Sequence, residues 1–148
     1  MARPGDPSEF IESFSSLSRC LRSLAAQAYA TVEIGSTQAK FVRHIGRRSR
    51  ISQAELARAT GTAPTLTGRA LQTLIGRGWV RRARSDQDRR EYVLELGAAG
   101  RRAQARIEKL RTQLATRIVA ALDARDLEDF DRIAKKILAA FESPVDRS

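Results

Sequence analysis

The chain has 148 residues, about one domain's worth, with one cysteine, one histidine and a formal net charge of +10 at pH 7. A single cysteine excludes an intrachain disulfide and any multi-cysteine metal site, and the lone His44 leaves packing or a place near DNA as its expected roles. Because acidic residues are scattered singly and no glycine-rich loop opens a helix, we expect no enzyme, no cofactor and no metal.

Residues 1–9 have the composition of a flexible tail, and a long helix is predicted after them. Its apolar residues recur at alternating four- and three-residue steps, which gives a helical seam that needs a partner: Phe10, Phe14, Leu17, Leu21, Leu24 and Ala28. Cys20 lies between Arg19 and Arg22 on this helix. A packing role for Cys20 is favoured over a redox role, although neighbouring arginines would favour the thiolate.

A second, shorter helix is predicted to begin near Ser52. Ser52 can cap it, and Glu55, three residues on, can return the hydrogen bond as a capping box. Gly61 supplies the left-handed residue that ends such a helix, so a tight turn follows.

The next helix is predicted to run from a Thr62 cap, with Pro64 in its first turn, to about Gly76. Three- and four-residue spacing places one set of residues on its buried face: Leu66, Ala70, Leu71, Leu74 and Ile75. The spacing leaves a second set largely outside that face: Thr65, Thr67, Arg69, Gln72 and Thr73. Two helices joined by a glycine turn are typical of a DNA-binding helix-turn-helix, but such pairs are also common in all-helical proteins.

Two β-prone runs follow, at residues 78–82 and 91–96. In the second run, Tyr92, Leu94 and Leu96 share one face. The loop between the runs, residues 83–90, is too charged for a core and too short for a domain linker, which favours a hairpin with a basic tip. Such a tip fits a minor groove.

The positive charge is concentrated around these elements. The segment from Lys40 to Arg90 has 13 basic and three acidic residues, a net charge of +10, whereas the remainder has 14 of each. A scattered excess would indicate a solvated surface, but a localised one predicts phosphate contacts, above all from Arg47, Arg48, Arg50 and Arg77 and also from Arg58, Arg81, Arg82, Arg84 and Arg89. No basic helix has an aromatic face, no apolar run could span a bilayer and no secretory signal is present, so we expect a cytoplasmic, nucleoid-associated protein without a membrane partner.

Two further helical seams follow the hairpin. The first contains Ala103, Ile107, Leu110, Leu114, Ile118 and Ala121; the second, which Pro144 should end, contains Leu127, Phe130, Ala134, Ile137 and Phe141. These terminal helices carry more apolar surface than the short middle segment can cover. We therefore expect a homodimer built from residues 10–34 and 99–143 around a DNA module at 35–98, with an intramolecular bundle as the alternative.

Together these motifs resemble the multiple-antibiotic-resistance regulator (MarR) family of winged helix-turn-helix proteins. The resemblance is carried, in order and spacing, by residues 53–57, 65–67, 74–78, 88–90 and 96–100. It implies a mainly α fold with a small β-hairpin wing, and a recognition helix whose Thr65, Thr67, Gly68, Arg69 and Gln72 meet the major groove. In the wing, formed with Arg84 and Arg89, Arg90 would enter the minor groove while Asp88 orients it. The chain departs from the family pattern at Gly97, where a threonine usually opens the next helix, and at Gly68, where a basic residue often stands.

The functional expectation is a sequence-specific regulator of transcription that binds double-stranded DNA as a homodimer on a pseudo-palindromic operator. By family resemblance it would be a repressor released by a small aromatic or phenolic effector, although no motif indicates the pocket residues. The alternative is an architectural protein that senses no ligand and binds DNA with weak sequence preference.

Overall fold

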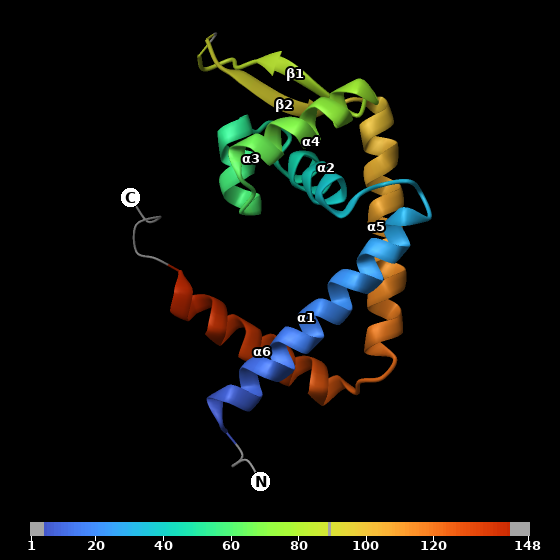
Figure 1. Ribbon diagram of the computed structural model, residues 1–148, viewed down its shortest axis with the longest axis vertical. Coiled ribbons are helices and arrows are strands. Elements are labelled where there is room, and N and C mark those ends of the chain that lie inside the picture. The colour runs from blue at the N-terminus through green and yellow to red at the C-terminus, as the bar shows by residue number, and fades with distance from the viewer. Residues whose placement is uncertain (1–4, 89, 143–148) are drawn as a thin grey trace. The chain divides into compact units, whose positions relative to one another are not determined.

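The computed structural model describes residues 5–88 and 90–142, which form two compact units, Met1–Arg111 and Thr112–Ser148. The first unit contains α1 (Pro7–Ala30), α2 (Ser36–Arg48), α3 (Gln53–Thr60), α4 (Pro64–Gly76), β1 (Val80–Arg84), β2 (Tyr92–Leu96) and the first turns of α5 (Ala98–Val119). The second contains the end of α5 and α6 (Ala124–Phe141). The predicted fold class, mainly α with a small β-hairpin wing, is confirmed (Figure 1).

The first helix begins earlier than predicted. Asp6 caps it, because its carboxylate accepts a hydrogen bond from the Ser8 backbone N–H at 3.0 Å, and Pro7 occupies a first-turn position that needs no donor. Residues 7–9 are therefore helical, not part of a flexible tail, and residues 1–4 lie outside the described part of the chain.

Residues 36–48 form α2, a helix that was not predicted from the sequence. The helix begins where the Gly35 N–H donates to the Gln38 side-chain oxygen at 3.3 Å. Four of its residues are buried at the centre of the first unit: Ala39, Phe41, Val42 and Ile45. Because α2 packs against α1, α3, α4 and β2, it is the platform on which the rest of this unit is built.

The core of the first unit draws one or a few residues from each element. Besides the α2 residues it contains Tyr29, Ile34, Ile51, Leu56, Leu71, Leu74, Val80, Leu94, Leu96 and Ile107. Burial of this apolar surface fixes the helix-turn-helix α3–α4 and the hairpin β1–β2 on one framework.

The hairpin is antiparallel, with Val80 opposite Leu96 and Arg84 opposite Tyr92. Strand β1 extends to Arg84, two residues beyond the run predicted for it, because the pairing of Ala83 with Val93 continues the ladder into the expected loop. A further bridge joins Ile51 to Leu94, whose N–H donates to the Ile51 carbonyl at 2.7 Å. The segment after α2 is thereby tied to the wing.

Helix α5 begins in tight contact with the start of β1. The Gly97 N–H donates to the Trp79 carbonyl at 3.0 Å, and Gly97 in turn accepts from Arg101 at 3.0 Å. Gly100 is buried against the same Trp79 carbonyl, so closely that a Cβ at this position would overlap it. Glycine at position 100 is therefore required by packing.

In the second unit, α6 is capped by a reciprocal pair in which Asp123 accepts from the Asp126 N–H at 2.8 Å and Asp126 accepts from the Asp123 N–H at 3.0 Å. The helix ends at Phe141, and Pro144, the expected stop, lies outside the described residues. Within residues 5–88 and 90–142, no helix combines the length and apolar character needed to cross a membrane.

Candidate nucleic-acid interface

Helix α3 has the boundaries that its sequence predicts. The Ser52 hydroxyl accepts from the Glu55 N–H at 3.1 Å, and the Glu55 carboxylate accepts from the Ser52 N–H at 3.2 Å. Gly61 adopts a left-handed conformation, with φ of 61°, and ends the helix. Leu56 is fully buried, so α3 is anchored beneath α4.

The start of α4 differs from the prediction in one respect. Pro64 is its first residue, as expected, but the capping position is Ala63, which offers no side-chain hydrogen bond. Thr62 belongs to the end of α3 instead: its N–H donates to the Ala57 carbonyl at 3.0 Å, and its hydroxyl accepts from the Thr60 hydroxyl at 2.9 Å. The prediction that Thr62 caps α4 is therefore wrong, because the turn closed by Gly61 recruits it.

The inner face of α4 is rotated from the predicted one at its N-terminal end. Thr67, predicted to face outward, has 1% of its surface exposed, whereas Leu66, predicted to be buried, is 56% exposed. Burial of Thr67 leaves no polar group unsatisfied, because its hydroxyl donates to the Ala63 carbonyl at 3.0 Å. Thr67 thus packs against the core, and its expected place on the outer surface of the helix is corrected.

The other predicted recognition residues remain accessible. Thr65, Arg69 and Gln72 are exposed on α4, and Gly68 is partly exposed. The Leu71 and Leu74 side chains anchor the opposite side of the helix in the core. The helix therefore presents hydroxyl, guanidinium and carboxamide groups to solvent, while its other side is held in the core.

The tip of the wing is organised by short polar contacts. The Asp88 carboxylate accepts from the backbone N–H of Arg90 at 3.0 Å, so Asp88 acts on the Arg90 backbone. The Ser85 hydroxyl accepts from Gln87 and Asp88 N–H groups, and Arg84 lies over the Tyr92 ring at 5.2 Å. Arg89 lies outside the described residues. Arg90 itself is exposed.

A charge network fixes the base of the wing. Glu95 accepts from Arg81 at 2.6 Å and lies 3.6 Å from Arg50, which also pairs with Asp86 near the tip. Two carboxylates therefore neutralise Arg50, so that a phosphate would have to compete with them for its guanidinium. Its position favours wing support over DNA contact.

The remaining predicted phosphate contacts differ in availability. Arg77 donates to the Glu33 carbonyl at 3.0 Å and lies over the Trp79 ring at 4.8 Å, so its side chain already supports the turn between α4 and β1. Arg47 and Arg48 are exposed in the last turn of α2. Their exposure leaves these two arginines accessible to a phosphate, as it does Arg58 and Arg82.

His44 and Cys20 occupy different environments. His44 lies on α2, where partial burial and the positive charges of Arg43, Arg48, Arg47 and Lys40 lower its pKa. Cys20 is exposed on α1 and takes no part in the core of the first unit. The physical reason is that α1 is buried only at Tyr29, near its C-terminal end, so residue 20 has no core to enter within its unit.

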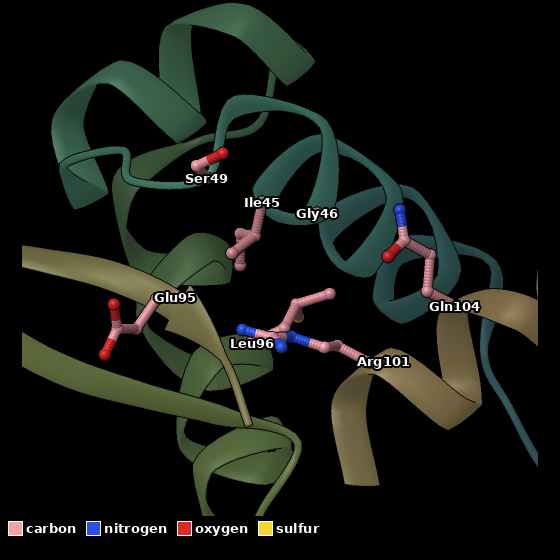
Figure 2. Close-up of a pocket in the computed structure, with 7 residues that line it drawn as sticks. All are labelled: Ile45, Gly46, Ser49, Glu95, Leu96, Arg101 and Gln104. Carbon is pink, nitrogen blue, oxygen red and sulfur yellow. The ribbon is translucent and has the colours of Figure 1, made fainter. Parts of the chain in front are cut away.

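Two hollows in the first unit were not indicated by any motif. One, of about 340 Å³, lies where α2, β2 and the start of α5 meet, and Figure 2 shows its lining: Ile45, Gly46, Ser49, Glu95, Leu96, Arg101 and Gln104. The other, of about 570 Å³, is formed by α1, α2 and α5 and has a cationic wall that includes Arg22, Lys40, Arg43 and Arg111. Because their residues come from distant parts of the sequence, spacing could not reveal them.

A helix-turn-helix followed by a two-stranded wing defines the winged helix class of fold. The structure is similar to that of a MarR transcriptional regulator from Methanosarcina mazei Go1, with 25% identity over 89% of this chain and 96% of the other and a TM-score of 0.77. It is also similar to Streptococcus pneumoniae FabT in complex with DNA, with 16% identity over 93% of this chain and 98% of the other and a TM-score of 0.80. A mutant MarR from E. coli complexed with operator DNA is similar too, with 21% identity over 90% of this chain and 99% of the other and a TM-score of 0.73.

The sequence comparison agrees with this fold. The model of the MarR family matches residues 34–92, the segment from the end of the α1–α2 connection to the start of β2. The sequence matches none of the curated proteins with which it was compared. The resemblance to the MarR family is thus confirmed, and the chain has the winged helix fold of that family's transcriptional regulators.

Proposed function

We propose that the chain is a sequence-specific regulator of transcription that binds double-stranded DNA. The observation that carries this proposal is the outer side of α4, where Thr65, Arg69 and Gln72 are exposed while the other side is locked into the core. An exposed helix with these donors, on a segment of net charge +10, suits the major groove of a polyanion. Two structural relatives were solved in complex with DNA, which supports DNA as the partner.

The wing and the end of α2 complete the proposed interface. Arg90, whose backbone Asp88 holds at 3.0 Å, is proposed to enter the minor groove beside the helix, together with the neighbouring arginines of the tip. Arg47 and Arg48 are proposed to contact the DNA backbone. Arg50 and Arg77, which have protein partners, would act mainly by positioning these elements.

A homodimer is proposed to hold two such modules. In α1, Phe10, Phe14 and Leu17 are each at least half exposed, and Phe10 and Phe14 stack on one another at 6.2 Å. In α6, described by itself, no residue is buried, and Phe130 is 61% exposed. Exposed apolar surface on each of these helices favours an interface, and a two-fold dimer would suit a pseudo-palindromic operator with half-sites about 34 Å apart.

The hollow between α1, α2 and α5 is the proposed effector site. Its wall carries four cations, of which Arg43 pairs with Glu108 at 2.9 Å and Arg111 approaches the Tyr29 hydroxyl at 3.5 Å. A small aromatic acid or phenol could place its ring against Ala25 and its charged group near Lys40. Binding there would shift the two recognition helices of the dimer and release DNA, as in a repressor. Since such a protein acts on the chromosome, its proposed location is the cytoplasm, in association with the nucleoid.

The test is fluorescence anisotropy of the full chain with its own upstream intergenic DNA and with a scrambled duplex, both at one near-physiological salt concentration. A regulator should prefer a two-fold symmetric site by about three orders of magnitude or more. Equal and steeply salt-dependent binding to both duplexes would contradict the proposal and favour an architectural protein. Adding benzoate as the aromatic acid should then lower the affinity for the symmetric site if the effector proposal holds.

A further inference from the structure

One large apolar residue of α4 is exposed. Leu66 is 56% exposed in the N-terminal half of the helix, whereas the neighbouring Thr67 is in the core. Thr67 takes that core position and satisfies its hydroxyl on the Ala63 carbonyl. The sequence thus places the apolar side chain outward and the hydroxyl inward, the reverse of the usual arrangement.

The surroundings of Leu66 belong to the proposed DNA-reading face. Residues three apart on a helix are neighbours on its surface, so Leu66 lies beside Arg69. Within α4, Arg69 is the sole charged residue, and the helix contains no acid. Leu66 is thus an exposed apolar side chain on a helix whose charge suits DNA.

The major groove offers one apolar group at a base edge, the C5-methyl group of thymine. We propose that Leu66 is a specificity-determining residue that packs against a thymine methyl group in each half-site, next to the base contacted by Arg69. The proposal rests on the proposed function, because it requires α4 to enter the major groove. It adds a preference for thymine at one position, next to the hydrogen bonds that Arg69 and Gln72 can form with base edges.

The experiment begins with selection of bound duplexes from a random-sequence library by the full chain. In the selected duplex, deoxyuridine then replaces thymine one position at a time, which removes only the methyl group and keeps the base pair. Affinities are measured by anisotropy for the wild type, L66A and the conservative variant L66M, with thermal unfolding as a check that the exposed substitutions leave the fold intact.

For the wild type, deoxyuridine at one position of each half-site should weaken binding about fourfold per methyl group. L66A should bind the thymine duplex more weakly and lose this sensitivity, and L66M should keep most of it. A selected duplex that shows no methyl sensitivity, or the same sensitivity in L66A, would overturn the role of Leu66 while leaving the regulator intact. A selection that yields no preferred sequence would overturn the proposed function, and the inference with it.

Discussion

Replacement of Gly68 in α4 by alanine should change stability and DNA affinity in opposite directions. Gly68 is the fifth of the 13 helix residues, and a Cβ there would meet only the Gln53 side chain, at 3.7 Å, an ordinary contact. Alanine in a helix interior is more favourable than glycine by about 1 kcal/mol, so G68A should raise the free energy of unfolding by that amount and the melting temperature by roughly 2–4 °C. Among residues 5–88 and 90–142, no contact requires glycine at this position.

The same methyl group should weaken DNA binding, because it would hold the helix backbone away from the base edges. Loss of one good base contact corresponds to about 1–3 kcal/mol, or about 5- to 150-fold in affinity. Thermal unfolding by circular dichroism and anisotropy on the preferred duplex measure the two effects. G76A is the matched control, since a Cβ at the last residue of α4 meets nothing within 4 Å and should leave the affinity unchanged. A G68A protein that binds as tightly as the wild type would refute the close approach, and a less stable one would refute the packing argument.

Five further substitutions test the proposed interface, the dimer and the histidine. R90A should lower DNA affinity about tenfold or more by anisotropy without changing the mass in light scattering, and unchanged affinity would contradict the wing assignment. R69A should reduce discrimination between operator variants by about 1–3 kcal/mol. R47A should mainly lower the slope of log affinity against log salt concentration by about one unit. An equal loss of affinity for all duplexes in both variants would contradict the separate roles of Arg69 and Arg47. F130S should shift the mass at micromolar concentration toward the monomer, and a wild-type monomer would rule out the dimer. Because the pKa of His44 is lowered in the folded protein, the unfolded chain protonates this imidazole at a higher pH than the folded one does. The free energy of unfolding should therefore fall as the pH drops below about 6.5, the ordinary pKa of histidine. H44Q should flatten this pH dependence, which urea unfolding between about pH 5 and 7.5 measures.

Local signals of the sequence were sufficient where one short-range interaction decides the structure. The Ser52 and Glu55 capping box and the left-handed Gly61 gave the limits of α3, because each acts within a few residues. Helix α2 was missed although its apolar residues Ala39, Val42 and Ile45 recur at three-residue spacing, because Lys40 and the arginines around them make the segment look polar. Only the burial of Phe41 by several other elements makes this segment the centre of the unit.

The candidate interface could be located from the sequence but not oriented. Hydrophobic periodicity assigned Leu66 to the core because leucine is more apolar than threonine, yet Thr67 can enter the core through its own helix hydrogen bond. The partners of Arg50 and Arg77 were likewise invisible, since Asp86 and the Glu33 carbonyl are far away in the chain. Tertiary contacts therefore decide which cations remain available to DNA.

Gly100 packs closely against the Trp79 carbonyl, so the first turn of α5 and the residue before β1 are in direct contact. Because a Cβ at position 100 would already overlap the Trp79 carbonyl, a movement of that turn toward the wing would displace Trp79 and the strand that follows it. The same helix supplies Arg111 to the hollow that α1 and α2 also line. In the proposed effector-bound state, a ligand in that hollow would therefore contact the same helix whose first turn packs against the wing.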